Sequence, residues 1–350
     1  MLIKVYCIKQ RAGEMMVRKL TKNFVGLIIT LIVLMGLQSS VWANSKIIFI
    51  PHDNRPISFA QTVESAEGLG FEIVVPPEHL LGNRTDSGKV EALWQWLFQE
   101  IKTADSVVLS ADSLIYGSLV DSRKHELSLE TLLERTDKFT KLKQLQPNLR
   151  IYVFASIMRS PRSSFGGVEP SYYEQYGPSI FAATALEDKA ETVGLTKVEE
   201  KELLKFKKNV PEAAFADWLE RRSKNFTVNA KLVSLVNNND FVYLALGRDD
   251  NAPFSQTRKE SRLLKEQADA TPVSKFQCLA GIDELGMVLL TRAINDLSFN
   301  IPLVKIEYAN GVGKNTVPTY SDEEIDKSIW QHLLATGALP TKYYDRADFV

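Results

Sequence analysis

Cysteine and histidine are scarce in this chain, with two Cys and four His among 350 residues. Cys7 lies in an N-terminal stretch that reads as a leader, which leaves Cys278 alone, so no intrachain disulfide is expected. Cys278 lies in an apolar run, and we expect it to be a small buried hydrophobic residue. The histidines lack the spacing of zinc ligands, so no metal site is expected from them; they are His52, His79, His125 and His332.

Three common nucleotide-binding and nucleophile motifs are also absent. The chain has no Gly-x-x-x-x-Gly-Lys-Ser/Thr loop, no Gly-x-Gly-x-x-Gly after a predicted strand and no Gly-x-Ser-x-Gly elbow. These absences argue against P-loop, dinucleotide-binding and serine-hydrolase chemistry, and no cofactor is expected.

The first 43 residues have the pattern of a signal peptide. Arg18, Lys19 and Lys22 precede an apolar segment, Phe24 to Leu37, of about 14 residues, which is short for a membrane span. Small residues at the −3 and −1 positions, ending at Ala43, predict a cleavage site. We expect a secreted or cell-envelope protein without a stable membrane span after cleavage. The alternative is an uncleaved N-terminal anchor.

The charge balance argues against nucleic acid as a partner. Six of the 42 Lys and Arg and one of the 43 Asp and Glu lie in the leader, so 36 basic and 42 acidic side chains remain. A net negative surface repels phosphate backbones. We expect a small-molecule or glycan substrate instead.

Strand and helix patterns alternate along the remainder, which predicts an α/β fold with a mostly parallel sheet. Most expected strands are short apolar runs without alternation, typical of strands buried on both faces. Either a (β/α)8-like barrel or an open doubly wound sheet fits. The expected strands are Lys46–Ile50, Phe71–Val75, Ser106–Ser110, Arg150–Ser156, Phe241–Leu246, Lys275–Leu279, Leu303–Tyr308 and Ala347–Val350.

One α/β domain is expected over residues 44–350, and residues 160–239 interrupt its alternation of strand and helix patterns. A polar, Gly-rich loop there is followed by charged helical stretches, which predicts a helical insertion after the fourth strand. The chain stops within a predicted strand at Val350, so we expect it to be a fragment, incomplete at its C-terminus.

Polar and acidic side chains follow five of the predicted strands. The carboxyl ends of parallel strands meet on one face, where sites are built. For each carboxylate the alternative is a helix cap or a turn. The candidate binding residues are Asp53, Asn54, Arg55, Asp112, Tyr116, Arg123, Arg159 and Asn251, and the candidate catalytic residues are Asp249, Asp250, Asp283 and Glu284.

Asp249 and Asp250 form the most informative of these groups. Adjacent carboxylates repel one another until one keeps its proton near neutral pH, as a general acid requires. The same oxygens also suit a hard cation. Asp283 and Glu284 form a second adjacent pair, a dipeptide that also occurs in glycosidases acting on N-acetyl sugars.

These motifs together resemble the bacterial family named domain of unknown function 4127 (DUF4127). The family's Pro-x-Asp-x-Arg-Pro is matched by Pro51 to Pro56, and its Asp-x-Leu-x-Tyr-Gly-Gly-Leu-x-x-Ser-Arg by Asp112 to Arg123. The resemblance extends from Lys46 to Val350 and implies no established reaction. Family members continue into a Gly-Trp-Asn-Thr-like block that this chain lacks. Further matches are Ile157-Met158-Arg159, Asp249-Asp250-Asn251-Ala252 and Gly281-Ile282-Asp283-Glu284.

The leading hypothesis is an exported hydrolase of the glycoside-hydrolase kind, which uses paired carboxylates. One alternative is a non-catalytic exported protein that binds carbohydrate or anions. The other is a hydrolase that depends on Mg²⁺ or Ca²⁺ held by the same carboxylates.

Overall fold

The computed structural model describes residues 45–163, 166–268, 271–308 and 313–350. The expected signal peptide, residues 1–43, lies outside the described residues. The chain divides into two units, Met1–Ser45 and Lys46–Val350, and the helices and strands of the fold lie in the second. Among the described residues, no helix is both long enough and apolar enough to cross a membrane.

Six parallel strands form the central sheet, in the order β2-β1-β3-β4-β5-β6. The predicted α/β class with a mostly parallel sheet is confirmed. Two further short strands, β7 (Leu303–Val304) and β8 (Leu339–Pro340), pair separately. The strand expected at Ala347–Val350 is reduced to one bridge, between Val304 and Phe349. The sheet strands are β1 Lys46–Ile50, β2 Glu72–Val74, β3 Ser106–Ser110, β4 Arg150–Ile157, β5 Tyr243–Arg248 and β6 Phe276–Ala280.

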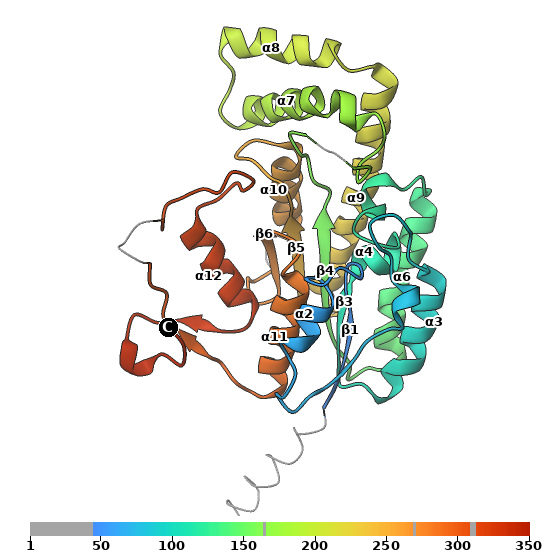
Figure 1. Ribbon diagram of the computed structural model, residues 1–350, viewed down its shortest axis with the longest axis vertical. Helices are drawn as coiled ribbons and strands as arrows, with labels where there is room; N and C mark the ends of the chain where they lie inside the picture. Colours follow the sequence, from blue (N-terminus) through green and yellow to red (C-terminus); the bar gives the residue numbers. More distant parts are fainter. Residues whose placement is uncertain (1–44, 164–165, 269–270, 309–312) are drawn as a thin grey trace, which may run out of the picture. The chain divides into compact units, whose positions relative to one another are not determined.

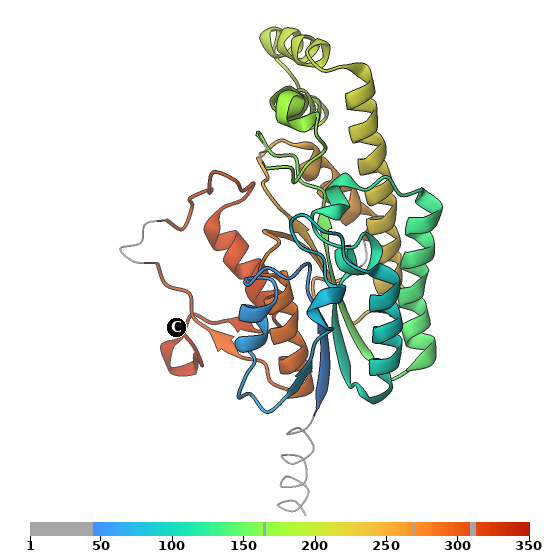
Figure 2. The ribbon, with the colours of Figure 1, turned by 45° about the vertical axis from the view of Figure 1, so that its right-hand side comes forward.

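Helices cover both faces of this sheet (Figures 1 and 2). On one face α11 packs against β1, β3, β4 and β5, and α12 contacts β6. Helices α4, α9 and α10 contact strands on the other face, together with α3 and α6. The helices are α2 Ala60–Glu64, α3 Val90–Glu100, α4 Ala111–Ile115, α5 Asp121–Lys124, α6 Leu129–Leu145, α7 Tyr173–Thr192, α8 Lys197–Lys208, α9 Glu212–Asn237, α10 Gln256–Ala268, α11 Leu285–Leu297 and α12 Ile325–Ala335.

Burial on both faces explains why the strands are apolar without alternation. In β1, Ile48 and Ile50 join the core beneath α3, α6 and α9. Phe49 points to the opposite face, where its ring stacks on Phe154 of β4 with centroids 6.5 Å apart. Gly286 of α11 lies against Phe49, since a β-carbon there would be 3.0 Å from its ring. Both faces of the strand are therefore buried away from water.

Helices α7 and α8 and the start of α9 follow β4 and lie beyond the carboxyl ends of the strands (Figure 1). Their own small core contains Tyr173 and Trp218. Helix α9 connects this core to the main one, where Leu232 is buried. Arg222 of α9 binds Glu260 of α10 at 2.7 Å and donates to the carbonyl of Met158, just after β4, at 2.7 Å. This buried pair fixes α9 to α10 and to the end of β4.

Three glycines allow the segment before α3 to approach the turn after α4. A β-carbon at Gly82 would lie 2.9 Å from the Gly117 carbonyl, and one at Gly88 only 2.3 Å from it. Gly117 has a φ of 117°, a conformation that residues with a β-carbon rarely adopt. The backbone contact thus requires glycine at all three positions.

We predict that Gly88→Ala lowers the free energy of unfolding by about 1–3 kcal/mol, because the new methyl group overlaps rigid backbone. The neighbouring exposed Lys89→Ala is the matched control and should change stability by about 0.5 kcal/mol or less. Urea denaturation measures both. Equal midpoints for Gly88→Ala and wild type would contradict the packing described.

Candidate active site

Loops from five strand ends carry carboxylates and arginines at the carboxyl edge of the sheet, in two groups of ion pairs. We call the two groups together the acid–arginine cluster. Its arginines come from the loops after β1, β3 and β4, and its carboxylates from those after β1, β4, β5 and β6. The members are Asp53, Arg55, Arg123, Arg159, Glu169, Asp249, Asp250 and Asp283.

Two arginines hold the carboxylates that follow β5. Arg123 of α5 donates to Asp249 at 2.9 Å. Arg159, after β4, is hydrogen-bonded to Asp250 and lies 3.8 Å from Asp249. Asp250 has a positive φ of 38°, uncommon for a residue with a side chain, so the turn itself is strained. Arg159 also binds the buried Glu169 at 2.5 Å.

A second arm of the cluster connects the first and last strand ends. Asp53 is buried and receives the Arg55 Nε–H at 2.9 Å as well as the Arg55 backbone N–H at 3.1 Å. The Arg55 guanidinium then reaches Asp283, after β6, at 2.7 Å. Side-chain exposures of 38% for Arg55 and 39% for Asp283 place this pair at the solvent boundary. The predicted convergence of Asp53, Arg55 and Asp283 is thus seen directly.

The electrostatics distinguish Asp249 from an ordinary surface aspartate. Burial raises the pKa of Asp249, the charges of Asp250 and Asp283 raise it further, and Arg123 and Arg159 oppose them. Asp249 and Asp283 follow β5 and β6, which are neighbouring strands of the sheet. Among the described residues, Oδ1 of Asp249 has no hydrogen-bond partner, whereas Oδ2 binds Arg123.

Asp112 lies beneath the cluster rather than in it. Its carboxylate is 1% exposed and accepts the Ser156 N–H at 2.9 Å and the Ser156 hydroxyl at 2.8 Å. The imidazole Nδ1 of His52 lies 3.1 Å from the Asp112 carboxylate and 3.0 Å from the Ser110 hydroxyl. Asp112 therefore ties the ends of β1, β3 and β4 together.

Three other sequence-predicted residues point away from the cluster. Asn54 donates its side-chain amide to Glu78 at 3.1 Å. Asn251 is 3% exposed and accepts a hydrogen bond from Ser255 within its own turn. Tyr116 packs its ring against His125, with centroids 5.0 Å apart. These residues shape the loops around the site.

Glu284 pairs with a residue far along the chain. Its Oε1 lies 3.0 Å from Nε2 of His332 in α12. Burial disfavours the charged imidazole, but hydrogen bonds to Glu284 and to the Ser328 carbonyl, together with the charges of Glu284 and Glu323, outweigh it and raise the pKa of His332. The neighbouring Asp283 binds Arg55 instead, so the two adjacent acids serve different partners.

The sequence did not indicate two residues that contact the predicted site residues, Glu169 and His332. Glu169 lies in an irregular Gly-rich loop that carries no periodic signal, and burial raises the pKa of its carboxyl group. His332 is 48 residues from Glu284, and only the packing of α12 brings them together. Spacing along the chain therefore gave no indication of either contact.

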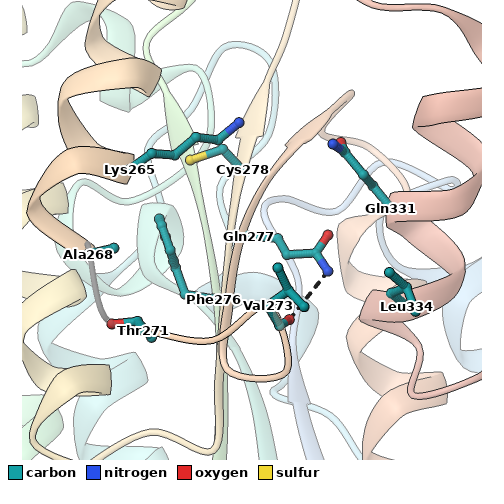
Figure 3. Close-up of a pocket in the computed structure, with 9 residues that line it drawn as sticks. All are labelled: Lys265, Ala268, Thr271, Val273, Phe276, Gln277, Cys278, Gln331 and Leu334. Carbon is teal, nitrogen blue, oxygen red and sulfur yellow. Dashed lines mark hydrogen bonds between the residues drawn. The ribbon is translucent and has the colours of Figure 1, made fainter.

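A separate cavity of 320 Å³ lies beside β6 and is lined in part by Cys278 (Figure 3). Lys265 and Cys278 point to one side of the strand, and Gln277 points to the other, toward Gln331. Cys278 is 2% exposed, as expected for a small hydrophobic residue. Burial raises its thiol pKa, which keeps it protonated and poorly nucleophilic. Within the described ranges, no three His, Cys, Asp or Glu side chains are grouped to hold a metal ion.

We predict that Asp112→Ala destabilises the fold by about 2–4 kcal/mol, because it leaves buried donors of Ser156 without an acceptor. Asp345→Ala, at an exposed position, is the control and should cost about 0.5 kcal/mol or less. Chemical denaturation measures the difference. A loss below about 1 kcal/mol for Asp112→Ala would show that Asp112 is not a structural anchor.

The His332–Glu284 pair predicts a pH-dependent contribution to stability. A folded-state pKa above that of the unfolded chain makes the contribution complete below about pH 6.5 and removes it as the pH rises through the folded value. The stability advantage of wild type over His332→Gln should therefore shrink as the pH rises. Urea midpoints across pH test this, with exposed His79→Gln as control. An advantage that grows with pH would contradict the pairing.

Comparison with known proteins agrees with the motifs. A family model described as "Protein of unknown function (DUF4127)" matches residues 47–350. No curated protein and no solved structure matches the chain. Since the match covers nearly all of the described residues, the chain belongs to the DUF4127 family.

Proposed function

We propose that this chain is an exported hydrolase that cleaves glycosidic bonds, with Asp249 as the proton donor. The proposal rests on how Asp249 differs from the other carboxyl groups of the acid–arginine cluster. Asp249 is the carboxyl group whose pKa is raised by burial and by two neighbouring acids, and it keeps 24% of its side chain exposed. A donor of this kind must hold its proton near neutral pH and still reach the substrate.

Asp283 is the best candidate for the second carboxylate. One oxygen is oriented by Arg55, which Asp53 holds in turn. The other oxygen has no hydrogen-bond partner among the described residues, and the side chain is 39% exposed. Glycoside hydrolysis needs one acid and one ionised carboxylate on either side of the bond. Asp283 would act as the base or nucleophile in this scheme.

The remaining members of the cluster position these two groups. Asp250 raises the pKa of Asp249, and Arg159, which Glu169 holds in turn, binds Asp250 directly. Arg123 orients Asp249 and leaves its Oδ1 to carry the proton. Glu284, paired with His332, would support the loop that carries Asp283.

Export and a glycan substrate belong to the same proposal. Export rests on the signal-peptide pattern of residues 1–43. A glycan is favoured by the density of carboxylates and arginines, since such groups bind hydroxyls in both directions, as donor and as acceptor. A metal-dependent mechanism has less support, because arginines occupy the positions beside the carboxylates that a cation would take.

Binding without turnover is the second candidate. It is favoured by the ion pairs that Asp249, Asp250 and Glu169 form with arginines. These pairs neutralise the acids and hold the side chains in fixed positions, as in a rigid binding surface. Calorimetric titration with oligosaccharides distinguishes the two. Saturable heat with no product in any titration would support binding alone.

We predict that Asp249→Asn and Asp283→Asn respond differently to the leaving group of the substrate. Loss of a proton donor should lower kcat by about 10²–10⁴-fold on glycosides with poor leaving groups and much less on dinitrophenyl glycosides, which need little protonation. Loss of the base or nucleophile should lower kcat on both classes.

Asp345→Asn, an exposed aspartate outside the cluster, is the matched control and should keep full activity. Steady-state kinetics on a panel of aryl glycosides provides the measurement. Asp249→Asn with unchanged kcat on poor leaving groups would remove the proposed donor. Failure of the wild-type protein to hydrolyse any glycoside in the panel would contradict the proposed reaction.

A further inference from the structure

Helix α8 is the outermost helix of the insertion after β4, and α7 lies between it and the sheet (Figures 1 and 2). None of its residues is buried. A capping box fixes its start, since the Thr196 side chain accepts the Glu199 N–H and the Glu199 side chain accepts the Thr196 N–H. The helix therefore presents a well-ordered surface to its surroundings.

One face of α8 holds the helix against α7. Glu199 pairs with Lys189 of α7, and Lys207 pairs with Glu187 of α7 at 2.5 Å. The apolar side chains on this face are half-buried; they are Leu203 and Phe206. The other lysines of the helix are thus not used in this packing.

These other four lysines form a stripe on the opposite face. They are spaced four, four and three residues apart, so they lie along one side of the helix. All four are exposed, and none has an ion-pair or hydrogen-bond partner among the described residues. The stripe is a local excess of positive charge on a chain whose residues 44–350 carry 36 basic and 42 acidic side chains. We call it the lysine stripe; its members are Lys197, Lys201, Lys205 and Lys208.

Exposed apolar side chains border the lysine stripe on both sides. Val198 and Leu204, 67% and 69% exposed, stand three residues before and after Lys201. The exposed acids Glu200 and Glu202 lie beyond them, four residues from Leu204 and Val198 respectively. Lysines next to exposed apolar residues are typical of helices that lie on a membrane surface. A soluble polyanion would bind the lysines and leave the apolar side chains in water.

We propose that the lysine stripe docks α8 on an anionic membrane surface. The ammonium groups bind lipid headgroups, while Val198 and Leu204 enter the boundary between headgroups and acyl chains. Attraction to an anionic bilayer increases with each lysine, so four unpaired lysines favour reversible, salt-sensitive binding without a membrane span. The inference depends on α8 alone and not on the hydrolytic role of Asp249.

The test follows acetylation of individual lysines in the whole protein by an N-hydroxysuccinimide ester, read by mass spectrometry. Vesicles of equimolar phosphatidylcholine and phosphatidylglycerol should slow acetylation throughout the lysine stripe, and vesicles of phosphatidylcholine alone should not. Salt at about 1 M should remove the protection, because the Debye length is then about 3 Å. The internal controls are Lys102 and Lys342, exposed lysines without an ion-pair partner among the described residues, which should react equally with and without vesicles.

A double substitution, Lys201→Gln with Lys205→Gln, should weaken the protection of the two remaining lysines of the stripe. The lipid concentration that gives half-protection should rise about tenfold to thirtyfold. Lys102→Gln with Lys342→Gln removes the same charge elsewhere and should leave that concentration unchanged.

Leu204→Gln should also weaken protection, whereas Leu145→Gln, at a leucine that is 55% exposed, should not. The proposal is overturned if anionic and zwitterionic vesicles leave the stripe equally reactive, or if the two double variants behave alike. Equal protection in Leu204→Gln and Leu145→Gln would also overturn it, because a partner that uses the lysines alone, such as a soluble polyanion, would then account for the data.

Discussion

The arrangement at the carboxyl edge depends on two arginines, Arg123 and Arg159. They come from the loops after β3 and β4 and bind carboxylates that follow β4 and β5. Without them, Glu169, Asp249 and Asp250 would repel one another in a poorly hydrated space. With them, the three acids are held close together and differ in their surroundings. The raised pKa of Asp249 follows from this arrangement, because burial and neighbouring charges outweigh the arginines at that position.

The helices after β4 are connected to the same frame by buried polar contacts. Arg222 of α9 binds the carbonyls of Met158 and Arg159 while its charge is met by Glu260. Asp188 of α7 accepts the backbone N–H of Ser255, in the loop that begins with the acids after β5. A buried charge that loses its partner is strongly destabilising, so these helices cannot shift without disturbing the loops that carry the cluster.

The sheet was predictable because its strands are buried on both faces and therefore appear as short apolar runs. Ser128 precedes the apolar run of α6, and its side chain caps that helix by accepting the Thr131 N–H. Ser321-x-x-Glu324 has the spacing of a capping box, yet α12 begins at Ile325 after Glu324, and no side chain caps it. Capping depends on local backbone angles that residue identity alone does not determine.

The site was predictable only as a set of converging loops. Parallel strands bring Asp53, Asp249 and Asp283 to one edge whatever their partners are. The hydrogen-bond partner of each side chain is set by packing between distant parts of the chain. The sequence therefore could not show that Asp112 would accept from Ser156 or that Glu284 would bind His332. The same holds for Tyr116, which packs on His125.

The pKa of Asp249 is raised by acids on its own loop and on the next one. Carbon-detected NMR titration of the Asp249 carboxyl group tests it most directly, in wild type, Asp250→Asn and Asp283→Asn. We expect a pKa above the ordinary aspartate range in wild type and a lower one in each variant, since each removes a charge that raises it. An ordinary or depressed pKa in wild type, or one unmoved by both substitutions, would contradict the account.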